Sequence, residues 1–323
     1  MTDVTVLVPV YNEGIALAGN LAATYECLQK YDRTYNFDYI IIDDGSSDNS
    51  YAAARLFARS HENVQLVHFE KNSGLGAALR TGFERAGGQY IVTLDADLSY
   101  RPDVVITLLE ALDSEGADVA MASPYMAGGS VANVPWFRKI LSREANRFLS
   151  LATSGRYSTL TCMVRAYRKS ALAGLRIDAD GMEVSPELAF AAIRSGARVV
   201  EIPARLEWSA GRAAGSSRLN WARLGRHIAG VLQCGFRFRP TLYLAIPGLF
   251  PGLLPIVIAT LLMMHASRQA LAIGTAVTVA VQYVSLAIFA GQAASFFGVT
   301  FFARRRSSVR RSNLEETYRA LHT

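Results

Sequence analysis

The sequence predicts an α/β protein with a mainly parallel sheet, followed by a hairpin of two membrane-spanning helices. Up to about residue 235, short β-rich runs alternate with helical segments, which is the pattern of parallel strands joined by crossover helices. Beyond that point charged side chains almost disappear. Residues 240–267 and 269–303 carry no full charge, and hydrophobic residues make up 51% of the whole chain.

Runs of β-branched and aromatic residues are expected to form strands at residues 4–10, 37–42, 64–69, 90–94 and 119–122. Segments with a helical pattern lie between them, at residues 15–30, 49–60, 75–86 and 102–112. Asp48 is a candidate N-cap for the second of these helices, and Pro102 suits the first turn of the fourth.

Polar clusters follow the first, second and fourth predicted strands, at residues 11–14, 43–48 and 95–97. In open parallel sheets, ligands bind outside the carboxyl ends of the strands. We therefore expect a ligand site at this edge of the sheet.

The fourth strand ends in Asp95-Ala96-Asp97. Carboxylates one residue apart beyond a strand end can both turn toward one hard cation. Mg²⁺ and Mn²⁺ take such oxygen ligands together with water and phosphate oxygens. The ion would act as a Lewis acid on a diphosphate leaving group. Asp-x-Asp is common in loops, so its position after a buried strand is what predicts a metal site here.

Two other turns at this edge have alternative interpretations. Asp43 and Asp44 can accept hydrogen bonds from a base or a ribose, or they can belong to a turn that caps the next helix. The glycine-bearing turn at residues 71–76 enters a helix, so its N–H groups can face phosphate. Its spacing is neither that of a P-loop nor that of the dinucleotide fingerprint.

The two apolar stretches, within residues 240–303, each exceed the about 20 residues that a helix needs to cross a bilayer. The alternative, a pair of buried helices in a soluble core, is disfavoured because such helices rarely run so long without a charged face. Arginines flank the pair on both sides, while the connection between the stretches holds only Arg268. The positive-inside rule therefore places the catalytic domain and both termini in the cytoplasm.

The net charge of +6 is concentrated at these flanks, including the basic tail at residues 304–323. The flanks should attract anionic lipid head groups. We expect no nucleic-acid partner, because no aromatic residues interleave the basic runs. Cys27, Cys162 and Cys234 show neither metal-ligand nor disulfide spacing, as expected in a reducing compartment.

Residues 133–152 and 218–239 interleave bulky apolar side chains with basic ones. This pattern is typical of helices that lie in the membrane interface. Ordinary surface helices packed on the sheet are the alternative for both. The expected organisation is a catalytic domain at 1–217, an amphipathic juxtamembrane segment at 218–239, two membrane helices at 240–303 and a basic cytoplasmic tail.

The motifs together resemble those of the GT-A glycosyltransferases of family 2, which share the order and spacing of residues 6–13, 41–48, 72–78 and 94–98. Further segments are similar to motifs of the polyprenyl-phosphate glycosyltransferases, such as dolichol-phosphate mannosyltransferase. These segments are Ser142-Arg143-Glu144-Ala145-Asn146, Arg165-Ala166-Tyr167-Arg168, residues 181–187 and residues 212–218. The resemblance covers roughly residues 4–220.

The resemblance implies an inverting transfer of sugar from a GDP- or UDP-sugar to polyprenyl phosphate at the cytoplasmic membrane face, with Mg²⁺ or Mn²⁺ as cofactor. It implies catalytic roles for Asp95, Asp97, Glu187 and Arg143, with both aspartates holding the metal. Arg143 would meet the acceptor phosphate, and Glu187 would face the sugar or the acceptor. The implied nucleotide-binding residues are Pro9, Tyr11, Glu13, Asp44, Arg212 and Arg218.

The chain departs from the family pattern at several positions. Ser99 stands where a metal-contacting Gln is common, and Pro124 stands where an Arg is common. Val184 replaces a Phe, and Arg218 replaces a Lys. These departures suggest a different sugar or nucleotide, or a divergent subgroup.

Other functions remain open. A transferase acting on a lipid or polysaccharide hydroxyl would need a base, and an inactive membrane-anchored protein would bind nucleotide without turnover. A processive synthase is disfavoured, because its Gln-x-x-Arg-Trp motif is not found. The membrane hairpin can also pack between subunits of a homo-oligomer.

Overall fold

The computed structural model describes residues 1–208, 230, 234–235, 237–239 and 283. The chain divides into two units, Met1–Phe238 and Arg239–Thr323, and the fold described here is that of the first. Among the described residues, no helix is long and apolar enough to span a bilayer. The predicted membrane helices, the basic tail and most of residues 218–239 lie outside the described residues.

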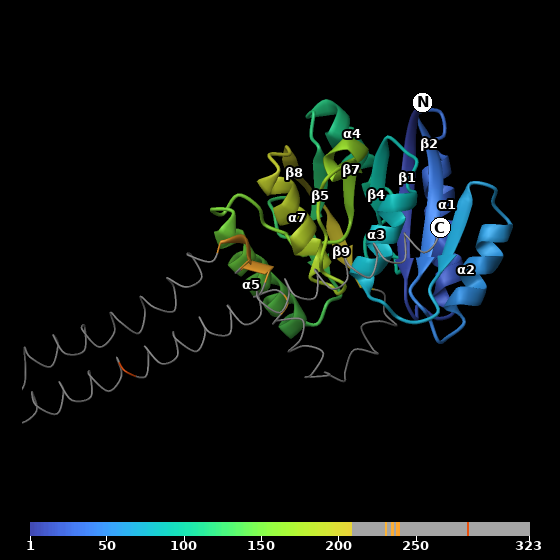
Figure 1. The fold of residues 1–323 in the computed structure, drawn as a ribbon, viewed down its shortest axis with the longest axis horizontal. Coiled ribbons are helices and arrows are strands. Elements are labelled where there is room, and N and C mark those ends of the chain that lie inside the picture. Colours follow the sequence, from blue (N-terminus) through green and yellow to red (C-terminus); the bar gives the residue numbers. More distant parts are fainter. Residues whose placement is uncertain (209–229, 231–233, 236, 240–282, 284–323) are drawn as a thin grey trace, which may run out of the picture. The chain divides into compact units, whose positions relative to one another are not determined.

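A seven-stranded sheet forms the centre of the first unit, in the order β3-β2-β1-β4-β7-β5-β8 (Figure 1). Its strands are β1 (Thr2–Val10), β2 (Tyr35–Asp43), β3 (Val64–His68), β4 (Tyr90–Thr93), β5 (Val119–Ser123), β7 (Arg165–Arg168) and β8 (Val199–Pro203). β7 runs antiparallel to β4 and β5, and the other neighbours in the sheet are parallel. The predicted α/β class and the mainly parallel sheet are therefore confirmed.

The helices are α1 (Ala16–Gln29), α2 (Ser50–Arg59), α3 (Leu75–Arg85), α4 (Val104–Ser114), α5 (Trp136–Ala152), α6 (Lys169–Leu172) and α7 (Val184–Arg194). The first five agree with the predicted segments apart from a few residues at their ends. Helices α6 and α7 were not predicted from the sequence.

Side chains on both faces of the sheet are buried, which explains the nearly continuous apolar runs of its strands. Along β1, Val6 and Val8 point into a core that includes Leu17 of α1, whereas Leu7 points into a second core on the opposite face. Ala78 of α3 packs in that second core. Helices cover both faces, so the loops at the strand ends are the accessible part of the sheet.

Short elements complete the fold beyond the parallel half. β6 (Ser130–Ala132) pairs in parallel with β9 (Arg205–Glu207) in a separate two-stranded sheet. The guanidinium group of Arg165 in β7 is fully buried and donates to Leu160 O at 2.7 Å. β6, β7 and β9 were not predicted because they are only three or four residues long and are rich in charged or small residues.

The predicted cap of α2 requires a correction. The N-cap residue is Asn49, whose side chain makes no capping bond, and Asp48 lies one position earlier. The Asp48 carboxylate still accepts the Ser50 N–H at 2.9 Å, and it also binds the Gly14 N–H at 2.9 Å. Asp48 therefore joins the helix start to the loop after β1, a contact that a local sequence pattern does not reveal.

Two glycines in helices should respond oppositely to substitution by Ala. A Cβ at Gly82 would lie 2.9 Å from Leu7 Cδ1 in the core, whereas one at Gly19 would meet no atom within 4 Å. We expect Gly82→Ala to destabilise the fold by about 1 kcal/mol through overpacking. We expect Gly19→Ala to stabilise it by about 0.5–1 kcal/mol through helix propensity. Thermal unfolding of both variants tests this, and shifts of the same sign would contradict the packing of α3 on β1.

Candidate active site

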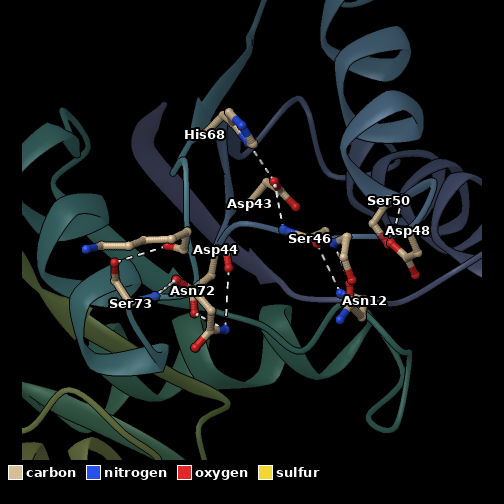
Figure 2. A network of polar contacts seen from close by, with 11 residues as sticks. Asn12, Asp43, Asp44, Ser46, Asp48, Ser50, His68, Asn72 and Ser73 are labelled. Atoms are coloured by element: carbon tan, nitrogen blue, oxygen red, sulfur yellow. Dashed lines mark hydrogen bonds and ion pairs between the residues drawn. The ribbon is translucent and has the colours of Figure 1, made fainter.

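The loops that follow β1, β2 and β4 meet at one edge of the sheet because these strands are adjacent and parallel. The predicted polar clusters at residues 11–14, 43–48 and 95–97 are therefore brought together, as expected. Figure 2 shows the network that joins the first two of these loops.

The loops after β1 and β2 bind each other through short polar side chains. Asn12 has a positive φ of 55°, and its N–H donates to Ser46 Oγ at 3.0 Å. Its side-chain Oδ1 accepts the Ser47 N–H at 2.8 Å. Ser50 Oγ accepts the Glu13 N–H at 2.9 Å. The backbone of the loop after β1 is thus held at Asn12 by Ser46 and Ser47 (Figure 2) and at Glu13 by Ser50.

Asp44 is 4% exposed and shapes the turn before α3. Its carboxylate accepts the N–H groups of Ser73 at 2.6 Å and Gly74 at 2.9 Å, and the Asn72 amide at 3.0 Å. Burial raises the pKa of Asp44, while the two backbone hydrogen bonds act in the opposite direction. Two oxygens offer about four acceptor sites, so Asp44 can still accept a hydrogen bond from a nucleotide.

Protein acceptors already use three N–H groups of the glycine-bearing turn at residues 71–76. Asp44 takes the N–H groups of Ser73 and Gly74, and Asp180 O accepts the Gly76 N–H at 2.8 Å. These three donors therefore hold the turn in place, and the interpretation that N–H groups of this turn face a phosphate stays a prediction.

Asp43, the last residue of β2, points into the protein interior. It is fully buried, and its Oδ2 lies 2.7 Å from Nδ1 of His68 at the end of β3. The ring of Tyr51 lies against that imidazole, with centroids 4.1 Å apart. Asp43 therefore joins the end of β2 to the end of β3 (Figure 2).

Ser99 orients both aspartates of the Asp95-Ala96-Asp97 motif. Its backbone N–H donates to Asp97 Oδ1 at 2.9 Å, and its hydroxyl donates to Asp95 Oδ2 at 3.3 Å. The side-chain amide of Asn20, in α1, donates to Ala96 O at 3.0 Å. The residue that departs from the family pattern is thus part of the site, and Asn20 is a supporting residue that the sequence reading missed. The sequence signal for Asn20 was a polar side chain within the apolar pattern of its helix.

The start of the loop that carries Arg212 and Arg218 lies beside this motif. The Glu207 N–H, in β9, donates to Ser99 O at 2.8 Å, and the next strand position, Leu206, bridges to Tyr100. The two arginines lie outside the described residues. The described chain that precedes them therefore contacts Ser99 and Tyr100.

The predicted acceptor residue Arg143 is exposed on α5. The same helix is fixed by Asn146, whose side chain accepts the N–H of Leu160 at 2.7 Å and donates to Ser142 O. Tyr125 connects this helix to the motif region. Burial raises the Tyr125 pKa, and the Ser142 hydroxyl and the nearby Arg143 charge oppose that shift.

Glu187, in the first turn of α7, binds protein backbone. Its two carboxylate oxygens accept the N–H groups of Asp178 at 3.2 Å and Ala179 at 2.8 Å. Burial raises its pKa, which these two hydrogen bonds oppose. The predicted contact of Glu187 with the sugar or the acceptor remains a prediction.

Asp48 should contribute stability that is lost in acid. Hydrogen bonds to Ser50 and Gly14 hold its pKa below the ordinary 3.8. A lowered folded-state pKa stabilises the fold above the unfolded value, and this contribution disappears as the pH falls through the folded value. We expect Asp48→Asn to lower the melting temperature at pH 7, and the difference from wild type to shrink below about pH 4. A difference that widens in acid would contradict the assignment.

Solved structures show the fold to be that of known glycosyltransferases. Glucosyl-3-phosphoglycerate synthase from Mycobacterium tuberculosis, solved with Mn²⁺, UDP-glucose and phosphoglyceric acid, matches with a TM-score of 0.57. The match covers 73% of this chain and 79% of that one, at 18% identity. At this identity the likeness shows the GT-A fold alone.

Relatives matched by sequence have a higher identity to this chain than that solved structure. Polyprenol monophosphomannose synthase of Mycolicibacterium smegmatis is 32% identical over 72% of this chain and 87% of its own length. An undecaprenyl-phosphate 4-deoxy-4-formamido-L-arabinose transferase of Edwardsiella ictaluri is 31% identical over 81% of this chain and 76% of its own length. Dolichol-phosphate mannosyltransferase of Pyrococcus furiosus is 30% identical over 62% of this chain, which spans only 55% of that relative. The model of glycosyl transferase family 2 matches residues 5–176, and the chain therefore belongs to this family and is a glycosyltransferase with the GT-A fold.

Proposed function

We propose that this enzyme transfers a sugar from a GDP- or UDP-sugar to a polyprenyl phosphate, with inversion, at the cytoplasmic face of a membrane. The observation that carries the proposal is the Asp95-Ala96-Asp97 motif, oriented by Ser99 at the carboxyl edge of the sheet. The relatives that act on polyprenyl, dolichyl or undecaprenyl phosphates support the acceptor.

The donor nucleotide would bind between the loops after β1 and β2. Tyr11 is 48% exposed at this edge, so its ring is accessible to a base or a ribose. Pro9 is the next-to-last residue of β1, and the N–H of Glu13 is held by Ser50. Asp44 would add a hydrogen bond from the second loop. Arg212 and Arg218, in the segment that follows β9, would bind the diphosphate.

The motif suits a divalent cation because its donors are all oxygens. Mg²⁺ and Mn²⁺ are commonly held by one or two carboxylates plus water and phosphate oxygens. Among the described residues no larger cluster of His, Cys, Asp and Glu gathers, so other ligands would come from the substrate or water. Asp95 and Asp97 would hold the ion, which would neutralise charge on the leaving diphosphate.

The acceptor would approach along α5. This helix exposes Trp136 (74%), Ile140 (53%) and Leu151 (48%) on the face that also carries Arg143 and Arg147. Apolar side chains mixed with arginines suit the boundary between lipid tails and anionic head groups. Arg143 would bind the acceptor phosphate there, while the hairpin at residues 240–303 would keep the enzyme at the membrane.

Transfer would form a bond between a phosphate oxygen and the anomeric carbon and break the bond to the nucleoside diphosphate. A phosphate monoester has a second pKa near about 6 and is largely dianionic at neutral pH, so no strong base is needed. The chain's own contribution is positioning and charge stabilisation. Arg143 would place the nucleophile, and Asp95 and Asp97 would fix the donor for displacement from the opposite face.

The metal-site assignment predicts the effect of Asp97→Asn. The substitution preserves volume but removes a charged metal ligand, so we expect transfer to polyprenyl phosphate to fall at least about 100-fold. The melting temperature should change little, because Asp97 is only partly buried. Lipid product from radiolabelled GDP- and UDP-sugars measures this, and Asp103→Asn on the start of α4 is the control. Undiminished transfer by Asp97→Asn would refute the assignment.

The acceptor assignment predicts a selective effect of Arg143→Ala. We expect KM for a short polyprenyl phosphate to rise about 10- to 100-fold, as for loss of a charge-assisted phosphate contact. KM for the sugar nucleotide should stay within about twofold. Arg147→Ala is the matched control, because Arg147 lies one turn further on the same face and pairs with Glu144 at 2.7 Å. If both variants raise KM for the polyprenyl phosphate equally, this face of α5 attracts the acceptor through its overall positive charge and Arg143 is not a specific phosphate ligand.

A further inference from the structure

The segment at residues 177–180, which we term the α7 loop, connects α6 to α7 and rests on the first turns of α3. Arg80 of α3 donates to Ala179 O at 2.7 Å and forms an ion pair with Asp180. Asp180 O also accepts the Gly76 N–H at 2.8 Å. The α7 loop is therefore attached to α3 through backbone and side chain.

The approach of the two backbones requires glycine in α3. A Cβ at Gly76 would lie 1.9 Å from Ala179 O, and one at Gly74 would lie 2.2 Å from Asp180 O. Real Cβ atoms do not come this close to a carbonyl oxygen. These glycines are therefore explained by the α7 loop.

Glu187 holds the α7 loop from the other side. It uses both carboxylate oxygens to accept the N–H groups of Asp178 and Ala179. Hydrogen bonds to a carboxylate are stronger than neutral ones. The loop thus lies between Glu187 of α7 and the first turns of α3.

The same turn of α3 is attached to the proposed donor site. Gly74 contacts the α7 loop, and its N–H donates to Asp44 at 2.9 Å. A displacement of the loop would therefore move the turn that orients Asp44. Three successive contacts therefore join Glu187 to that carboxylate: Glu187 to the α7 loop, the loop to Gly74, and Gly74 to Asp44.

Helix α7 also contacts the described part of the chain that precedes the predicted membrane helices. The rings of Phe190 and Phe238 stack with centroids 4.2 Å apart. Burial raises the pKa of Cys234 to about 12; the nearby Glu187 charge adds to this rise, and the Arg237 charge opposes it. Glu187 thus lies between the juxtamembrane segment and the donor side of the sheet.

We infer that Glu187 is a positioning residue for the donor nucleotide, which fixes the α7 loop on α3 and through it the turn bound by Asp44. This inference rests on the proposed function for the identity of the nucleotide, but not for the contacts themselves. It gives Glu187 a role different from the contact with sugar or acceptor that the family resemblance implies.

The test compares Glu187→Gln with Glu187→Ala in the full-length protein. Gln keeps one acceptor oxygen and loses the charge, so it should retain part of the function that Ala loses. Dissociation constants of GDP and UDP are measured with Mn²⁺ and without acceptor, and amide hydrogen exchange is measured at residues 177–180. Glu183→Gln is the matched control, since Glu183 lies one turn earlier on α7.

We expect Glu187→Gln to weaken nucleotide binding about 3- to 10-fold, and Glu187→Ala about 10- to 30-fold. Amide hydrogen exchange at Asp178 and Ala179 should accelerate in both Glu187 variants. The kcat of Glu187→Gln should fall less than about threefold. Glu183→Gln should match wild type in nucleotide affinity and in exchange. Gly76→Ala should also accelerate exchange and weaken binding, since it displaces the loop without changing Glu187. It provides the test if Glu187→Ala does not fold.

Three results would overturn the inference. One is unchanged exchange in Glu187→Gln, and another is faster exchange with unchanged nucleotide affinity. The third is a loss of kcat of about 1000-fold or more at unchanged affinity, which would place Glu187 at the reacting atoms. Absence of turnover in wild type with every donor would instead refute the proposed function, while the exchange measurement would still test the contacts.

Discussion

Parallel pairing of β2, β1 and β4 is the constraint on which the rest of this structure depends. β1 lies between the other two, with Val6 opposite both Tyr39 and Val92. Adjacent parallel strands must end at the same edge, so the three loops that follow them converge. The burial of both faces leaves this edge as the accessible part of the sheet. The position of the site thus follows from the strand order and does not depend on which side chains the loops carry.

The carboxylates at this edge divide into two groups with different tasks. Asp43, Asp44 and Asp48 are engaged with His68, backbone N–H groups and Ser50, and they hold the loops in place. Asp95 and Asp97 are oriented by Ser99 at the end of β4. Buried carboxylates are costly unless hydrogen-bonded, and in the first group the carboxylate of Asp44 and one oxygen of Asp43 accept hydrogen bonds from protein donors. The second group is the one suited to a cation and a diphosphate.

The proposed donor and acceptor sites lie on different parts of the fold. The proposed donor side consists of strand ends whose loops are mutually hydrogen-bonded. The proposed acceptor side is the exposed face of α5, whose opposite face is fixed by the buried Asn146. Tyr125 lies between the two, beside Ser142 and close enough to Tyr100 and Arg143 to interact with them electrostatically. A rigid donor edge and an amphipathic acceptor face are what a reaction between a soluble nucleotide and a membrane lipid requires.

The sequence by itself determined the α/β class, the first five strands and helices, and the Asp95-Ala96-Asp97 motif, because periodicity and strand-end polarity are local signals. It also pointed to the family through the order of its motifs. It could not show that β7 runs antiparallel between β4 and β5, since strands of four residues carry little local pattern. It also could not show why position 76 requires glycine, because the neighbouring Ala179 is remote in the chain. The roles of Ser99, Asn20 and Glu187 are set by contacts between separate elements, and only the tertiary structure decides such contacts.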